Sequence, residues 1–225
     1  MTHLKPGSLS DQFKSRIFFG FNYRFSALKS SLKQTINNPN YGTLINLSFQ
    51  STHGLAFKEE KKNDWRFTDS NRLSSITGNL GIHFVDLIID LLGPIKMLEF
   101  HEQAIANVDS IDTVNIVFKC ESNVFGTIFL SYAAPCQHYV TLNFSNAIVN
   151  IDCLTGEAEL YAPRDYFDST GMFSRPNCHA YSLNWSDKDF GLRNSLAFFF
   201  DTVCNSASFE QNLFASSLKS NMFFV

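Results

Sequence analysis

The sequence has 225 residues, enough for one large domain or two small ones, and its 44% hydrophobic and 17% charged residues can fill a core. A net charge of −3, with no basic patch interleaved with aromatics, argues against a nucleic-acid partner. No run reaches the roughly 18 apolar residues of a membrane helix, and no signal peptide is recognisable, so we expect no membrane association. Five widely spaced cysteines without a CxxC pair predict free thiols in a reducing cytoplasm.

The first predicted elements are a short strand and an amphipathic helix. Residues 16–21 (Arg-Ile-Phe-Phe-Gly-Phe) form an apolar run typical of a buried strand. Ser26 is a good N-cap, and after it apolar residues recur every fourth position from Leu28 to Ile36. This spacing predicts a helix that ends near Asn38.

A strand, a long loop and a second helix follow. From Thr43 to Gln50 apolar residues alternate with mainly polar ones, which predicts a half-buried strand. Residues 52–75 have no periodicity, and loops of this length in compact domains are usually functional or disordered. From Thr77 the spacing is helical, and we expect the helix to end at Gly93.

The predicted helix over residues 77–93 is apolar on most of its circumference, apart from one narrow polar line. That line consists of Asn79, His83, Asp86 and Asp90. Because such a helix is mostly buried, these groups must be hydrogen-bonded or must face a cavity. A satisfied buried histidine and two surface aspartates would explain the line without any function. However, Asn79 and His83 lie one turn apart, so one can position a hydroxyl while the other takes its proton.

The second half of the chain predicts a sheet. Six segments have strand character and short connections, which favours an antiparallel meander: residues 95–101, 112–119, 124–132, 139–145, 147–153 and 157–161. Residues 163–187 are expected to be irregular. Helical spacing resumes from Leu192 to Val203, and Ser208 with Gln211 predicts a capping box for a last helix through Leu218. The expected fold class is α+β, with helices on one face of a large, mostly antiparallel open β-sheet.

Several familiar catalytic motifs are missing. The sequence contains no G-x-G-x-x-G turn, Walker loop, H-E-x-x-H or G-x-S-x-G. The histidines that could bind a metal are scattered without ligand spacing, so we expect no metal site: His53, His83, His101, His138 and His179.

Three stretches give the chain a family resemblance. Residues 20–25 (Gly-Phe-Asn-Tyr-Arg-Phe) resemble a G-x-N-x-R-F junction, and residues 54–66 resemble a loop that ends in a tryptophan. Residues 78–86 resemble G-x-D-x-G-x-H-x-x-D. These motifs resemble the C-terminal domain of the Gfo/Idh/MocA oxidoreductases, the glucose-fructose oxidoreductase and inositol dehydrogenase family. The resemblance implies a dihydrodipicolinate-reductase-like domain over residues 16–225, with residues 1–15 a short remnant or linker.

The resemblance also implies a chemistry and a set of roles. The family uses NAD or NADP to oxidise or reduce a hydroxyl-bearing carbon, usually of a sugar or cyclitol, and His83 matches its proton acceptor or donor. Asn79 stands where the family usually has an aspartate, and an amide can orient a hydroxyl but cannot share a proton.

Further residues are implied at the edge of the site. Trp65 and Arg66 match the substrate rim, although they can equally anchor the loop by packing on the sheet. Arg24 can reach a substrate group or tie the start of the helix to the loop. Lys5, in Leu-Lys-Pro, resembles the lysine with which the family polarises the substrate oxygen beside the cofactor.

Two readings of the function stay open. The chain is expected either to supply the catalytic histidine and substrate pocket of an oxidoreductase, or to be a non-catalytic binding or oligomerisation module. The first reading requires a dinucleotide fold that this sequence does not contain, for example on a separate nucleotide-binding chain. The second fits self-association into a homo-oligomer through the open sheet face, as is common in the family.

Overall fold

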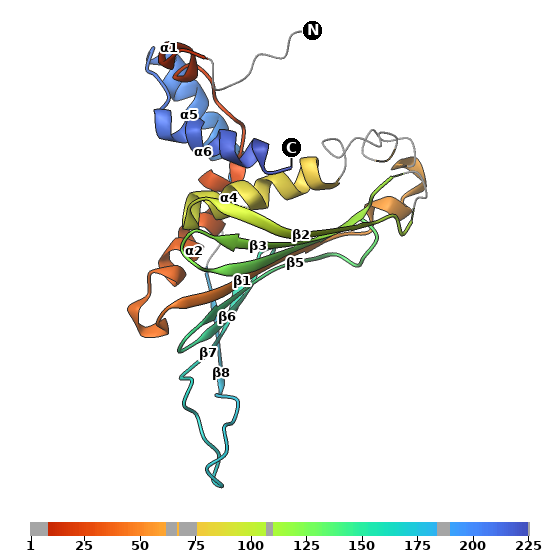
Figure 1. Cartoon of the computed structure of the whole chain (residues 1–225), viewed down its shortest axis with the longest axis vertical. Coiled ribbons are helices and arrows are strands. Elements are labelled where there is room, and N and C mark those ends of the chain that lie inside the picture. Colours follow the sequence, from red (N-terminus) through yellow and green to blue (C-terminus); the bar gives the residue numbers. More distant parts are fainter. Residues whose placement is uncertain (1–8, 62–66, 68–75, 107–109, 184–189, 225) are drawn as a thin grey trace.

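The computed structural model describes residues 9–61, 67, 76–106, 110–183 and 190–224. Its centre is one eight-stranded sheet with helices packed on one face (Figure 1). The strands are Leu44–Thr52 (β1), Ile95–Gln103 (β2), Thr113–Cys120 (β3), Phe125–Ser131 (β4), Gln137–Phe144 (β5), Ile148–Asp152 (β6), Glu157–Tyr161 (β7) and Cys178–Ser182 (β8). This α+β architecture confirms the expected fold class.

The sheet consists of two antiparallel meanders joined through β1. The strand order is β2-β3-β4-β1-β5-β6-β7-β8, and β1 pairs in parallel with β4 and antiparallel with β5. All other neighbouring strands are antiparallel. The first strand in the sequence therefore lies in the middle of the sheet, where it brings distant segments together.

The helical elements are mostly short. They are Asp11–Lys14 (α1), Asn22–Phe25 (η2), Ala27–Ile36 (α2), Pro39–Tyr41 (η3), Leu55–Phe57 (η4), Glu59–Lys61 (η5), Thr77–Gly81 (η6, a π-helical turn), Ile82–Leu92 (α4), Leu192–Cys204 (α5) and Gln211–Met222 (α6). Ser26 caps α2 as predicted, because its side chain accepts the backbone N–H of Lys29. Gly93, with a φ of 83°, ends α4. In the described part of the chain, no helix has the length and apolar character needed to cross a membrane.

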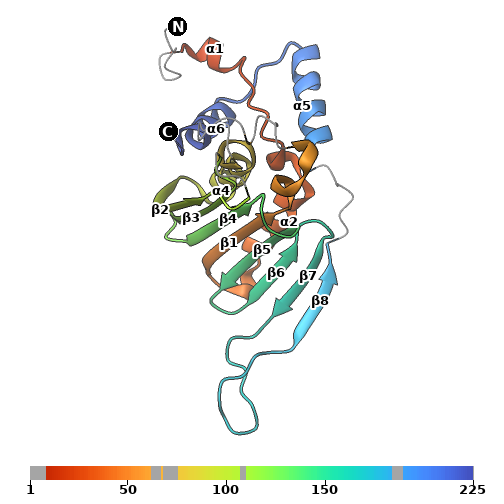
Figure 2. The ribbon, with the colours of Figure 1, turned by 90° about the vertical axis from the view of Figure 1, so that its right-hand side faces the viewer.

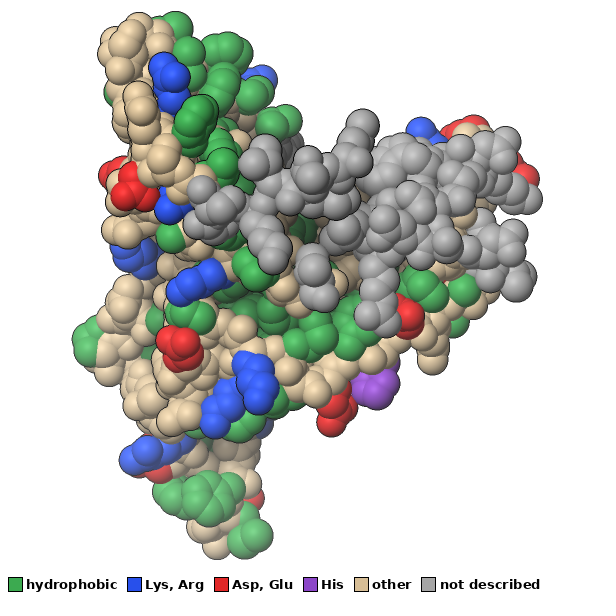
Figure 3. Space-filling model, turned by 45° about the horizontal axis from the view of Figure 1, so that its top comes forward, with side chains coloured by type: hydrophobic (Ala, Val, Ile, Leu, Met, Phe, Trp, Pro, Cys, Tyr) green, Lys and Arg blue, Asp and Glu red, His purple; other side chains and the backbone are tan. Residues whose placement is uncertain are grey.

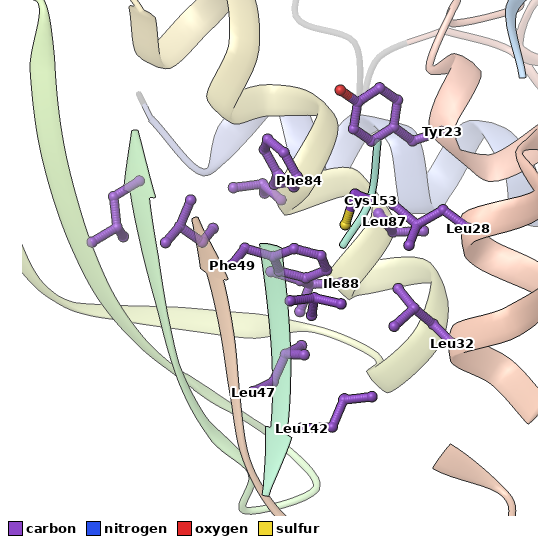
Figure 4. Close-up of a cluster of buried hydrophobic side chains, with 14 of the residues drawn as sticks. Tyr23, Leu28, Leu32, Leu47, Phe49, Phe84, Leu87, Ile88, Leu142 and Cys153 are labelled. Atoms are coloured by element: carbon purple, nitrogen blue, oxygen red, sulfur yellow. The ribbon is translucent and has the colours of Figure 1, made fainter. Parts of the chain in front are cut away.

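The core lies between the sheet and the two helices α2 and α4 (Figure 4). Leu47 and Phe49 of β1 point toward Leu87 and Ile88 of α4, and all four side chains are fully buried. Leu28 of α2 joins the same cluster. Each such side chain contributes about 1.5–3 kcal/mol through burial, so the core fixes α4 on the sheet.

Three local predictions were wrong. Residues 16–21 form no strand, because the phenylalanine side chains pack on other rings instead, Phe18 against those of Phe25, Phe198 and Phe209. The segment expected to be irregular contains β8, an edge strand with mostly exposed side chains and hence no apolar alternation. The N-cap of α6 is Glu210, without a side-chain cap bond, so the predicted capping box does not form.

Helix α5 forms where the apolar spacing predicted it, but the apolar side chains that define this spacing lie on the surface of the molecule. Leu192, Leu196 and Val203 are each about half exposed, whereas Ser195 and Thr202 are buried. Hydrophobic side chains accordingly gather on the surface of the upper helices (Figure 3). Helix α1, within the segment expected to be a linker, packs against α6.

Candidate functional site

The π-helical turn η6 positions the first polar residues of the α4 segment. It carries Asn79 and leads directly into α4, which carries His83. A Cβ at Gly81 would lie 3.0 Å from Leu130 Cδ1, so this glycine lets the helix approach β4 closely. π-Helical turns are rare and occur frequently at functional sites.

His83 is enclosed by aromatic rings. Its imidazole stacks on Tyr23, with ring centroids 5.2 Å apart, and contacts the edge of Phe21 at 6.1 Å. Its Nδ1 is buried and has no hydrogen-bond partner among the residues that the structure describes. Burial lowers the pKa of His83 below its usual value, so the ring is neutral at neutral pH. A neutral imidazole with a free ring nitrogen is suited to exchange a proton with a ligand hydroxyl.

Asn79 is held in place by a tyrosine from the sheet. Its Nδ2 donates to Tyr132 Oη at 2.8 Å, and the Tyr132 ring is buried. Tyr132 in turn stacks on His53 at 4.7 Å and contacts Phe67 edge-on at 5.8 Å. The amide is therefore oriented by the protein, and its carbonyl oxygen accepts no hydrogen bond from the described residues.

The sheet adds His138 to this region. Ser51 pairs with His138 across β1 and β5, and Ser51 Oγ lies 2.8 Å from His138 Nδ1. Burial, and then the neighbouring His53, lower the pKa of His138. Phe190 links the region together, since its ring lies 6.2 Å from that of His138 and 5.1 Å from that of Tyr23.

These side chains form one cluster at the end of β1, here called the His83 cluster. It consists of Tyr23, His53, Asn79, His83, Tyr132, His138 and Phe190. The helical spacing predicted Asn79 and His83 as site residues. The other histidines were interpreted as dispersed, because only the strand register brings them close. No three His, Cys, Asp or Glu side chains among the described residues could hold a metal ion.

Arg24 and Asp86 form a buried ion pair beneath the cluster. Arg24 Nε and Nη2 donate to the two oxygens of Asp86, each at 2.5 Å, and Ser220 Oγ donates to Oδ1 at 2.8 Å. Arg24 Nη1 also donates to Ser216 at 2.8 Å. Burial raises the pKa of Asp86, and the hydrogen bonds from Arg24 and Ser220 oppose that rise. The pair joins η2, α4 and α6.

The remaining predicted site residues are Arg24, Trp65, Arg66 and Lys5. Arg24 ties η2 to α4 and α6 rather than the start of the helix to the loop, and its contact with a substrate stays a prediction. Trp65, Arg66 and Lys5 lie outside the described residues. The structure therefore brings together Asn79 and His83 and supports both from beneath.

Comparison with a family model matches residues 30–150 to the GFO/IDH/MocA C-terminal domain. That range includes β1, η6, α4, β2 to β5 and the first part of β6, and thus most of the His83 cluster. Among proteins with curated functions, none matches the sequence.

Solved structures with the same fold include three oxidoreductases. Levoglucosan dehydrogenase, in complex with NADH and levoglucosan, is 14% identical over 91% of this chain, with a TM-score of 0.68. An oxidoreductase from Agrobacterium radiobacter, in complex with NAD+, L-tartaric acid and magnesium, is 14% identical over 90%, with a TM-score of 0.65. A dehydrogenase from Chromobacterium violaceum is 19% identical over 91%, with a TM-score of 0.64. The matches cover only 58–62% of those three chains.

Proposed function

This chain belongs to the Gfo/Idh/MocA family through its C-terminal domain, and we propose that it is the substrate-binding half of an NAD(P)-dependent oxidoreductase that acts on a sugar or cyclitol hydroxyl. The observation that carries the proposal is His83, which is neutral and buried and whose Nδ1 has no partner in the described part of the chain, one helical turn after an oriented amide. A polar atom that the fold leaves unpaired gains a partner when a ligand hydroxyl binds.

The proposed chemistry separates a proton from a hydride. When a carbinol is oxidised, His83 would take the hydroxyl proton as the carbon–oxygen double bond forms, and NAD or NADP, when bound, would supply the hydride acceptor. Asn79, fixed by Tyr132, orients the hydroxyl through its amide oxygen, but it cannot accept the proton because an amide is not basic. Of Asn79 and His83, only His83 can then accept the proton. Trp65 and Arg66 are proposed at the substrate rim.

Among the described residues, no strand is followed by a glycine-rich turn and a helix in the arrangement that holds a dinucleotide. We therefore propose that NAD or NADP is held by a polypeptide segment or chain outside the described residues, and that Lys5 lies close to this cofactor. Five free cysteines agree with the proposed cytoplasmic location.

A second candidate is a binding or oligomerisation module without turnover. It is favoured by large hydrophobic side chains that stay exposed, among them Phe125 on the sheet and Phe200 on α5. In that case the cluster around His83 would be a structural remnant, and no polyhydroxyl ligand would bind there.

Calorimetric titration of the purified chain tests the first candidate. The ligands are myo-inositol, glucose and levoglucosan, followed by NADH and NADPH. We expect at least one polyhydroxyl compound to bind, and to bind at least about fivefold more weakly to His83→Ala and Asn79→Ala, since each variant loses a hydrogen bond worth about 1 kcal/mol.

The matched control is His101→Ala, at an exposed histidine on β2 that is paired with Glu99. Circular dichroism establishes that all variants fold. If no polyhydroxyl compound binds the folded chain, or if both site variants bind like the control, the proposal is wrong. Tight binding of NADH would contradict only its second part, the external dinucleotide site.

A further inference from the structure

A cavity lies at the opposite end of the strands from His83. It has a volume of about 270 Å³ and is formed by the turn between β5 and β6, the end of β7 and the segment over residues 163–176. That segment belongs to the long connection between β7 and β8, which extends beyond the sheet as an arm (Figure 2). The cavity is thus separate from the His83 cluster and is not explained by the proposed oxidoreductase function.

One wall of the cavity is fixed by Asn146. Its backbone N–H donates to the Tyr41 carbonyl and its Nδ2 to the Asn40 carbonyl, both at 3.0 Å. Its Oδ1 accepts the backbone N–H of Arg164 at 3.2 Å. The turn is therefore tied both to η3 and to the arm, so the cavity walls are held in place before any ligand arrives.

The cavity contains two arginines, although the chain as a whole is acidic. Arg175 Cζ lies 4.2 Å from the centre of the Tyr161 ring, a cation–π contact that holds the guanidinium group over β7. Arg164 lines the same cavity. Among the described residues, neither arginine forms an ion pair.

The nearby carboxylates form no ion pair with either arginine among the described residues. Glu159 accepts a hydrogen bond from Tyr161 Oη at 3.0 Å. Asp168 accepts the backbone N–H groups of Thr170 and Met172 in the turn at the tip of the arm. The exposed Asp165 adjoins Arg164 in sequence but does not line the cavity. The two guanidinium groups are therefore available to an external anion.

The rest of the lining is largely apolar, with Phe144, Ile148, Pro163 and Pro176 contributing. We propose that this cavity binds a small oxyanion, a carboxylate or phosphate carried on an apolar body. Arginine pairs with both groups through parallel hydrogen bonds, and the apolar lining receives the body of the ligand. The volume is near the lower limit for ligand pockets and restricts the ligand to about one ring.

Calorimetric titration of the full chain with benzoate, benzamide and phenyl phosphate tests this proposal. Benzamide has nearly the same shape as benzoate but no charge. We expect benzoate or phenyl phosphate to bind with a Kd below about 1 mM and benzamide to bind at least about tenfold more weakly, because it cannot form charge-assisted hydrogen bonds. The tighter of the two anions identifies the carboxylate or the phosphate as the natural group.

The double variant Arg164→Gln/Arg175→Gln is expected to lose at least about tenfold in anion affinity. The matched control is Arg16→Gln, which removes one exposed arginine far from the cavity, near α1. Since both arginines are on the surface, the variants should fold, and thermal unfolding verifies that they do. Failure of both anions to bind at 10 mM would overturn the proposal, as would equal binding of benzamide or unchanged binding by the double variant.

Discussion

Arg24 and Asp86 carry opposite charges in surroundings from which water is almost excluded. Their side chains are 4% and 0% exposed. Arg24→Met leaves the buried Asp86 carboxylate without its cation and should lower the free energy of unfolding by about 3–5 kcal/mol. Asp86→Asn leaves Arg24 with only the Asp90 carboxylate, whose Oδ1 lies 3.5 Å from Arg24 Nη1, and should lower the free energy of unfolding as well. Urea denaturation measures this loss.

A surface ion pair provides the comparison for that prediction. Lys14 and Asp11 lie 3.0 Å apart on α1, and Asp11 is largely exposed. Asp11→Asn should change the free energy of unfolding by less than about 1 kcal/mol. If Asp86→Asn were as mild as Asp11→Asn, the buried pair would not hold η2, α4 and α6 together.

His83 should make the stability of the chain depend on pH. Burial lowers its pKa in the folded state below the value of the unfolded chain, about 6.5, so the unfolded chain binds more protons as the pH falls. The contribution of His83 is complete above the unfolded pKa and is lost as the pH falls toward the folded one. The wild type should therefore lose more unfolding free energy between pH 7.5 and 5.5 than His83→Gln does.

Urea titrations of both proteins at the two pH values measure this difference. Because burial also lowers the pKa of His138, some pH dependence should persist in the variant. Equal losses in the two proteins would mean that His83 titrates normally and is accessible to water.

On the scale of single elements, the packing of β4 beside β3 requires the glycine at position 126. A Cβ at Gly126 would lie 2.1 Å from Cζ of Phe118, which is fully buried on the neighbouring strand β3. Gly126→Ala should therefore overpack the core and lower the free energy of unfolding by about 1–3 kcal/mol, measured by urea denaturation. A second substitution, Phe118→Leu, should make Gly126→Ala less harmful than it is in the wild type.

Gly20→Ala is the control for overpacking, since nothing lies within 4 Å of its added Cβ. It should be close to neutral. If Gly20→Ala and Gly126→Ala had the same effect, the loss at Gly126 would come from the backbone rather than from the Phe118 ring.

Helix α4 could be predicted from the sequence because all of its signals are local. Its apolar spacing, its polar line and the glycine that ends it lie within residues 77–93, and the structure confirms the helix. Tyr132 and His138 could not be predicted as members of the His83 cluster, because their positions depend on β1 lying between β4 and β5. Strand order is a property of the whole chain that no local period encodes.

Burial was harder to predict than helix formation. The spacing from Leu192 to Val203 correctly predicted α5, yet the face it defines is exposed. Periodicity identifies the apolar face of a helix, but it does not show whether another part of the protein packs on that face. Similarly, β8 escaped prediction because an exposed edge strand does not alternate between core and solvent.

On the scale of the whole molecule, the open face of the sheet combines a polar network with isolated apolar side chains. Phe125, Asn46, Asn143 and Ile148 lie in one row across β4, β1, β5 and β6. Asn143 Nδ2 donates to Asn46 Oδ1 at 3.0 Å in the middle of this row. Phe125 and Ile148, at its two ends, are 48% and 42% exposed.

We expect this row to be the centre of a homo-oligomer interface, because association would bury both apolar ends around an already paired amide. In sedimentation velocity runs over a range of concentrations, the wild type should associate. Phe125→Asp/Ile148→Asp should stay monomeric, because association would bury its new carboxylates. Leu196→Asp, on the exposed face of α5, is the matched control and should associate like the wild type. A wild type that is monomeric throughout would disprove self-association, whereas loss of association in Leu196→Asp alone would move the interface from the sheet to α5.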